Sequence, residues 1–180
     1  MYTSGSTGRP KGVQVAHTGV VNLLAGTFYL YGSAEWSFAL STSYIFDMFH
    51  NMLFLCIGAV GGVGSLLRDS LSLLTLDATI RITHMADVPS VLSVANMPRT
   101  VTLVRAGGEA MTQQLIRHCR VGTLLSNDYG PTEVSIVSVM RLLQAEWASG
   151  LSSIGSVTQN VSSFVVEPEE NLAQPISVWG

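Results

Sequence analysis

The sequence predicts an α/β fold in which partly parallel sheets are flanked by helices. Segments with apolar residues at helical spacing alternate with short β-branched segments, about one change every fifteen to twenty residues, which is the order that builds parallel sheets covered by helices. Two of the predicted strands run directly into glycine-rich or polar turns, and sheets of this class bind ligands beyond the carboxyl ends of their strands. The 180 residues, 47% of them hydrophobic, are enough for one sizeable core.

The first half of the chain contains two helical and two strand patterns. Residues 15–30 form a predicted helix, because their apolar residues recur at helical spacing, and the apolar residues 36–43 form a predicted strand that ends in small hydroxyl side chains. The uncharged stretch 52–67 is shorter than the ~20 residues that cross a bilayer. Four glycines also interrupt it, so we expect a buried helix followed by a buried strand and no membrane span.

The second half continues the alternation. A short helix is expected over 70–76, with Ser70 as its N-terminal cap. Proline is favoured at the first position of a helix. The remaining predicted elements are strands over 79–85, 100–104, 123–125, 134–142 and 162–166, a helix that begins at Pro89 and a helix over 112–120.

Composition limits the classes of function. The net charge is -3, and acidic residues (12) outnumber lysine plus arginine (9), so nothing favours a nucleic-acid partner. Charged residues make up 12% of the chain, well below the ~25% of an average soluble domain, which indicates surface that other parts of a protein cover. Cys56 and Cys119 show no pairing pattern, so we expect buried thiols, a reducing compartment and a cytoplasmic location.

A run of glycines and hydroxyl residues near the start is the strongest functional signal. It reads Tyr2-Thr3-Ser4-Gly5-Ser6-Thr7-Gly8-Arg9-Pro10-Lys11-Gly12-Val13. Glycine lets a ligand approach the backbone closely, free N–H groups in such a turn bind anions, and lysine binds phosphate as a point charge. The spacing is not that of the P-loop. A flexible glycine-serine linker is the alternative, but a linker has no need of Arg9, Pro10 and Lys11, so we predict a phosphate-binding loop.

This run resembles the signature loop of the adenylate-forming enzymes, the superfamily of acyl-CoA synthetases, luciferases and nonribosomal peptide synthetase adenylation domains. It is most similar to the branch that activates amino acids. The resemblance implies that the loop holds the β- and γ-phosphates of ATP. The residues it implicates are Thr3, Ser4, Gly5, Ser6, Thr7, Gly8 and Lys11.

Two further motifs follow predicted strands and extend the resemblance. The first, Arg105-Ala106-Gly107-Gly108-Glu109-Ala110, is similar to the Gly-Gly-Glu turn that lies beside the adenine. The second, Ser126-Asn127-Asp128-Tyr129-Gly130-Pro131-Thr132-Glu133, is similar to the Asn-x-Tyr-Gly-Pro-Thr-Glu motif. The resemblance implies that Tyr129 stacks on the adenine, that Thr132 bonds a phosphate oxygen and that Glu133 holds Mg²⁺, roles that suit an aromatic face, a hydroxyl and a hard oxygen ligand. Lys11, Thr132 and Glu133 are the expected catalytic residues.

Asp47 is an acid among apolar neighbours, in Ile45-Phe46-Asp47-Met48-Phe49. A buried carboxylate is costly unless it is paired, so Asp47 either caps a helix or binds a ligand. In amino-acid-adenylating relatives a Phe-Asp pair here holds the α-amino group of the substrate. The segment between Asp47 and Gly58 is about two residues shorter than in such relatives, and the aromatic residue usually found a few positions on is absent.

The resemblance also implies the walls of a substrate pocket. They are Met48, Ala86, Val104, Ala106, Asp128, Ile136 and Val137. Asp128 stands out in this apolar set and favours a substrate with a polar or basic side chain.

Residues 1–180 are therefore expected to be a partial AMP-binding (adenylation) domain, a central fragment of the large N-terminal domain of these enzymes. Both ends are expected to be truncated and the C-terminal subdomain absent. Lys11 is the only lysine and no aspartate follows Asp128, so the chain lacks the ribose-binding aspartate and the C-terminal catalytic lysine of the family.

The implied reaction joins a carboxylic acid, expected to be an amino acid, to ATP with Mg²⁺. The acyl group then passes to a phosphopantetheine thiol on a carrier protein in nonribosomal peptide synthesis, a branch of secondary metabolism. Two alternatives stay open. One is an acyl-CoA or aryl-acid ligase of the same superfamily, and the other is a non-catalytic remnant or truncated gene product.

Overall fold

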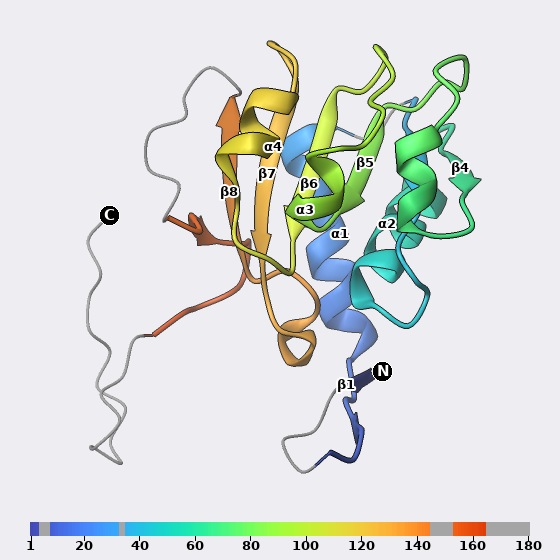
Figure 1. Cartoon of the computed structure of the whole chain (residues 1–180). Helices are drawn as coiled ribbons and strands as arrows, with labels where there is room; N and C mark the ends of the chain where they lie inside the picture. Colours follow the sequence, from blue (N-terminus) through green and yellow to red (C-terminus); the bar gives the residue numbers. More distant parts are fainter. Residues whose placement is uncertain (4–7, 33–34, 145–152, 165–180) are drawn as a thin grey trace.

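A seven-stranded sheet forms the centre of the computed structural model, which describes residues 1–3, 8–32, 35–144 and 153–164. The sheet order is β4-β3-β5-β6-β7-β8-β9 (Figure 1). The strands are β3 (Ser37–Leu40), β4 (Val63–Leu66), β5 (His84–Asp87), β6 (Leu103–Gly107), β7 (Leu124–Tyr129), β8 (Val139–Gln144) and β9 (Ser156–Val157). The pairs among β4, β3, β5, β6 and β7 are parallel, whereas β8 and β9 add antiparallel pairs. The predicted α/β class is confirmed.

Helices cover both faces of this sheet. They are α1 (His17–Tyr31), α2 (Asp47–Gly58), α3 (Pro89–Leu92) and α4 (Gln113–His118), with 3₁₀ turns η1 (Ser70–Thr75) and η2 (Thr132–Val134). One hydrophobic cluster packs Leu92 and Leu115, from α3 and α4, against Val104 and Leu125 of the sheet. A second packs Met52 and Leu55 of α2 against Phe38 and Leu40 of β3, with Leu24 and Phe28 of α1 alongside. A separate hairpin, β1 (Tyr2–Thr3) with β2 (Lys11–Gly12), precedes α1.

The chain reverses its direction across the sheet between β3 and β5. The connection from β3 through α2 leads to β4 on one side, and the chain then returns past β3 to place β5, β6 and β7 on the other. Such a switch point leaves a crevice at the carboxyl ends of the neighbouring strands, where ligands of open α/β sheets bind. The topology therefore places the ends of β3, β5, β6 and β7 around one potential site.

Several predicted elements are present with different boundaries. The expected strand over 79–85 becomes β5 at His84–Asp87, because Asp77 accepts hydrogen bonds from the backbone N–H and hydroxyl of Thr79 and holds a turn there. The strand expected over 100–104 begins later, at Leu103. The strand expected over 134–142 starts at Val139, since η2 and the positive φ of Ser135 and Ile136 interrupt it.

Three local expectations are wrong. Asp69, not Ser70, caps η1 by accepting from the backbone N–H of Ser72. The strand β4 lies at the sheet edge and is mostly exposed rather than buried, because nothing pairs with its outer side among the described residues. Residues 162–164 form no strand, and 165–166 lie outside the described residues.

Candidate functional site

A cavity of about 1050 Å³ opens at the switch point. Its walls come from the carboxyl ends of β5, β6 and β7, the first turn of α2, and the segment from β4 to η1. Of the residues implicated by the sequence, it is lined by Asp47, Met48, Gly107, Gly108, Asp128, Gly130, Ile136 and Val137. The structure thus brings together residues from four separate stretches of the chain.

Three expected pocket residues do not line this cavity. Val104 and Ala106 are fully buried in the cluster between the sheet and the helices α3 and α4. Ala86 is buried beneath α2 in the second cluster. Alternate residues of a strand point to opposite faces, so Val104 and Ala106 share one face of β6, while Gly107 reaches the cavity from the other.

Asp47, which lines the cavity, is in contact with Thr132. The Thr132 hydroxyl donates a 2.7 Å hydrogen bond to Oδ2 of Asp47, joining residues 85 positions apart. Asp47 is the first residue of α2, and Phe46 holds the N-cap position without a side-chain hydrogen bond, so Asp47 is not the cap. Its half-buried carboxylate instead faces the loop after β7.

Two glycines are required by close backbone contacts around the cavity. A Cβ on Gly130 would lie 2.5 Å from the carbonyl oxygen of Ile136 and 2.8 Å from the nitrogen of Ser138. A Cβ on Gly107 would lie 2.7 Å from the carbonyl oxygen of Asp128. Glycine is the residue that allows backbones to approach this closely, so both positions fix the shape of the β6 and β7 ends.

The hairpin that carries Lys11 lies at the same end of the sheet as the loop after β7 (Figure 1). Lys11 is in β2, which pairs with β1. Residues 8–12 are all exposed. The first turn of α1, which follows the hairpin, abuts the residue after η2, because a Cβ on Gly19 would lie 2.2 Å from the Ser135 hydroxyl oxygen. Thr3 is described, whereas the expected phosphate-binding residues 4–7 lie outside the described residues.

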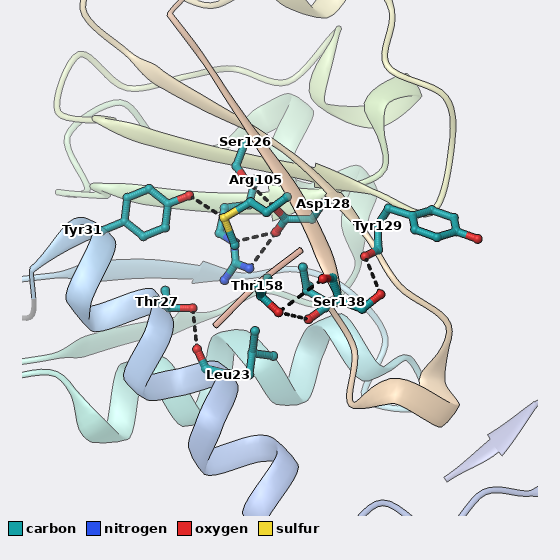
Figure 2. Close-up of polar contacts among 11 residues, drawn as sticks. Leu23, Thr27, Tyr31, Arg105, Ser126, Asp128, Tyr129, Ser138 and Thr158 are labelled. Atoms are coloured by element: carbon teal, nitrogen blue, oxygen red, sulfur yellow. Dashed lines mark hydrogen bonds and ion pairs between the residues drawn. The ribbon is translucent and has the colours of Figure 1, made fainter. Parts of the chain in front are cut away.

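The remaining motif residues differ in exposure. The Tyr129 ring is half exposed and points away from the sheet, while its backbone oxygen accepts from the N–H and hydroxyl of Ser138 (Figure 2). Glu133 is exposed on η2. Glu109 accepts a 3.2 Å hydrogen bond from the backbone N–H of Ser90, and Asn127 is buried.

Arg105 is a buried charge that the sequence analysis did not single out. Its Nε and Nη2 atoms each lie 2.7 Å from Oδ2 of Asp128, and the two side chains are 1% and 0% exposed. The Ser126 hydroxyl donates to the other oxygen of Asp128 (Figure 2). The available signal was an arginine at the end of an apolar predicted strand. Because buried arginines are paired, such a position indicates an acidic partner nearby.

The same charge affects two neighbours on the α1 side of the sheet. Burial, and secondarily the Arg105 charge, lower the pKa of His84 to about 4. His84 stacks on Trp36, with ring centroids 4.4 Å apart. Burial raises the pKa of Tyr31, whose hydroxyl lies 3.2 Å from the sulfur of Met140.

Asp87 is a second buried acid that the sequence analysis missed. It ends β5 and lines the cavity, with 4% of its surface exposed. Its Oδ2 accepts from the Ser41 hydroxyl and its Oδ1 from the backbone N–H of Val88, both at 2.9 Å. The Ser41 bond ties the end of β3 to the end of β5 at the switch point.

No cluster of three or more histidine, cysteine or acidic side chains with the geometry to hold a metal occurs among the described residues. A Mg²⁺ ion commonly binds through one or two carboxylates and substrate phosphates, so Glu133 alone fits such an ion only as part of a nucleotide complex. In the described part of the chain no helix is long and apolar enough to cross a membrane.

The fold is an α/β domain with a cavity at the carboxyl ends of its parallel strands. The chain belongs to the AMP-binding enzyme family, whose family model matches residues 1–180. The sequence resemblance to adenylate-forming enzymes is thereby confirmed.

Relatives with a similar sequence are peptide synthases. The chain is 34% identical to tyrocidine synthase 3 of Brevibacillus parabrevis over 200 residues, which covers 100% of this chain and 3% of that protein. It is 35% identical to malpinin synthetase of Mortierella alpina, covering 94% of this chain and 2% of the synthetase. The chain therefore spans a few per cent of the length of these relatives.

Solved structures share the fold. The Vibrio cholerae adenylation domain AlmE in complex with glycyl-adenosine-5'-phosphate matches with a TM-score of 0.70 and 24% identity, over 87% of this chain and 31% of that one. The o-succinylbenzoate CoA synthetase of Bacillus subtilis with ATP and magnesium ion matches with a TM-score of 0.74 and 23% identity, over 94% of this chain and 38% of that one. At these identities the likeness concerns the fold.

Proposed function

We propose that this chain is part of an enzyme that activates an amino acid with Mg·ATP as an acyl-adenylate, for transfer to the thiol of a carrier protein in nonribosomal peptide synthesis. The hydrogen bond between Thr132 and Asp47, which lines the cavity, carries the proposal. The two residues belong to separate motifs, implicated in binding the amino group and a phosphate oxygen, and the fold places them in contact. The names of the relatives, which match along the chain at 33–35% identity, support the same class of reaction.

The proposed reaction forms one bond and breaks one. A carboxylate oxygen of the acid bonds to the α-phosphorus, and the bond from that phosphorus to the pyrophosphate oxygen breaks, so pyrophosphate leaves. Positioned cations and donors lower the barrier of such reactions by stabilising charge as it develops. In this chain Lys11 and Thr132 are proposed to hold phosphate oxygens. Glu133 is proposed to hold Mg²⁺, which neutralises phosphate charge when it is bound.

Asp47 favours an amino acid over other carboxylic acids. An ammonium group that enters a narrow cavity needs a fixed counter-charge. No cation among the described residues pairs with Asp47, and its side chain accepts a hydrogen bond from the Thr132 hydroxyl. An acyl-CoA or aryl-acid ligase would have no use for a carboxylate at this place.

Binding of matched acyl-adenylate analogues tests the proposal. Two sulfamoyl-adenosines are compared by calorimetry, one carrying leucine and one carrying 4-methylpentanoic acid, which is leucine without its amino group. The wild-type chain is expected to bind the leucyl compound more tightly. Asp47→Asn should weaken the leucyl compound about 10- to 100-fold, the equivalent of one charge-assisted hydrogen bond, and should change the other compound little.

Asp77→Asn is the matched control, because Asp77 is an exposed acid whose bonds are to Thr79, away from the cavity. It should leave both affinities unchanged. Equal losses for both compounds in Asp47→Asn, or tighter binding of the compound without the amino group, would favour the acyl-CoA or aryl-acid ligase. Binding of neither compound would favour a non-catalytic remnant.

A further inference from the structure

Arg105 does not line the cavity, but its side chain bonds Asp128, which does. It precedes Gly107 by two positions on β6, so the two residues are on the same face of the strand. Gly107 lines the cavity, whereas Arg105 is 1% exposed. On the opposite wall, Asn51 lies one helical turn below Asp47 on α2 and is equally buried. The Arg105 side chain therefore lies between Asn51 of α2 and Asp128 of the sheet, and of these two residues Asp128 lines the cavity.

All three nitrogens of the guanidinium group have partners at that position. It forms the pair with Oδ2 of Asp128 through Nε and Nη2, at 2.7 Å each. With the Asn51 amide oriented so that its oxygen faces the guanidinium group, that oxygen accepts from Nη1 and Nη2 of Arg105, at 3.0 and 3.2 Å. Figure 2 shows the Arg105 and Ser126 side chains meeting at Asp128. Arg105 is thus held from α2, β6 and β7.

This arrangement removes the negative charge that Asp128 would present to the cavity. One of its oxygens bonds Arg105 and the other accepts from Ser126. A buried ion pair has no net charge, and breaking it by removing one partner strands the other at a cost of several kcal/mol. A cationic ligand group beside Asp128 would therefore have to compete with an arginine already in place.

Apart from Asp87 at the end of β5, a buried acid that accepts hydrogen bonds from Ser41 and Val88, the cavity side chains next to Asp128 are apolar. Met48 approaches the Gly107 position closely, since a Cβ there would lie 3.4 Å from its terminal methyl carbon. Ile136 and Val137 line the cavity beside Asp128 and are nearly fully buried. A floor made of a neutral ion pair and these three side chains favours an uncharged apolar group.

We propose that Arg105 is a specificity-determining residue, which closes the cavity floor and neutralises Asp128 so that the activated acid carries an uncharged, apolar side chain. This inference rests on the proposed function, because it concerns the acid that the same cavity takes. It assigns Asp128 to the floor rather than to a basic substrate. Replacing Arg105 with a small residue should open the floor and give Asp128 a free charge.

Norleucine and lysine provide the matched test, since their side chains are of similar length and differ by the terminal ammonium group. Their sulfamoyl-adenosine compounds are titrated into the wild-type chain, Arg105→Ala and Arg105→Ala/Asp128→Asn. The wild type should bind the norleucyl compound at least about 10-fold more tightly, because an unpaired charge is costly to bury. Arg105→Ala should shift the ratio at least about 10-fold toward the lysyl compound, and the double variant should return it toward norleucyl.

Preference of the wild type for the lysyl compound, whether through Asp87 or Asp128, would overturn the inference. An unchanged ratio in Arg105→Ala would overturn it as well. If Arg105→Ala alone does not fold, the double variant, which has no stranded carboxylate, carries the test. It should then accept norleucyl and longer apolar side chains with similar affinity, whereas a loss of affinity as the side chain lengthens would show that the floor is closed by something else.

A measurement without any nucleotide separates failure of this inference from failure of the proposed function. Ethylguanidinium, which matches the end of an arginine side chain, is added at tens of millimolar while the midpoint of thermal unfolding is measured. It should raise the midpoint of Arg105→Ala, but not that of the wild type or the double variant. If no adenylate compound binds the wild type, the proposed function fails. The ethylguanidinium result then decides whether Arg105 closes a space that opens onto Asp128. If ethylguanidinium does not raise the unfolding midpoint of Arg105→Ala selectively, the inference about Arg105 is refuted.

Discussion

Replacing Gly130 with alanine should destabilise the chain and displace the loop that carries Thr132. The added Cβ would lie 2.5 Å from the Ile136 oxygen, 2.8 Å from the Ser138 nitrogen and 2.9 Å from the Val137 Cα. All three atoms belong to the backbone, so no side chain can rotate to make room. Overpacking of this kind typically costs about 1–3 kcal/mol, which is a large part of a stability of about 5–15 kcal/mol.

The assay is urea unfolding, combined with calorimetric binding of Mg·ATP. Gly26→Ala is the matched control, because a Cβ on this glycine inside α1 would meet its nearest neighbour, the Gln159 side chain, at an ordinary 3.7 Å. That substitution should stabilise the chain by about 0.5–1 kcal/mol, since glycine is unfavourable inside a helix. Gly130→Ala with wild-type stability would refute the contacts at the β7 end. Lost stability with unchanged ATP affinity would refute the link between this turn and nucleotide binding.

Three further predictions concern charge. Lys11→Ala should weaken ATP binding about 10- to 100-fold and AMP binding less, since Lys11 is assigned to the outer phosphates, and equal losses in the two titrations would contradict this. The His84 pKa of about 4 lies below its ordinary value of 6.5, so folding loses stability as the pH falls from 6.5 toward 4, by up to about 3 kcal/mol. His84→Phe should flatten that part of the pH profile of urea unfolding, and an unchanged slope would assign it to other groups. Pyrophosphate exchange into ATP by the 180-residue chain should not exceed the exchange by Lys11→Ala. The reason is that Lys11 is its only lysine, whereas the family uses a second lysine at the α-phosphate. Robust exchange would show that the second lysine is dispensable.

The sequence allowed the fold class to be predicted, and also the sheet edge where the structure has its cavity, because both follow from local patterns. Strands that run into Gly107 and into Tyr129 had to end at the same edge of a parallel sheet, and the structure pairs β6 with β7 in parallel. Boundaries were harder, because apolar composition does not show where the backbone turns. The turn held by Asp77 and the left-handed φ of Ser135 moved two strands along the chain.

Contacts across the sheet could not be predicted, because they depend on register. Arg105 can pair with Asp128 because the register of β6 and β7 places Arg105 opposite Ser126 and Gly107 opposite Asp128. A shift of one residue would move Asp128 to the opposite face. For the same reason, the sequence could not show that Val104 and Ala106, which were expected as pocket walls, are buried under α3 and α4 instead.

Four carboxylates line the cavity, and Asp69 is paired with Arg68 and Ser72. The other three differ in how well their charge is compensated, and this difference favours Asp47 as the proposed partner of the substrate amino group. Asp128 has a full counter-ion in Arg105. Asp87 has two fixed hydrogen-bond donors and is almost completely buried, so a ligand ammonium would have to displace contacts that join β3 to β5. Asp47 is half-buried and receives one hydroxyl, which Thr132 can turn toward a phosphate oxygen instead. Because an exchangeable donor leaves a carboxylate free at little cost, an ammonium is stabilised more at Asp47 than at either of the other two acids.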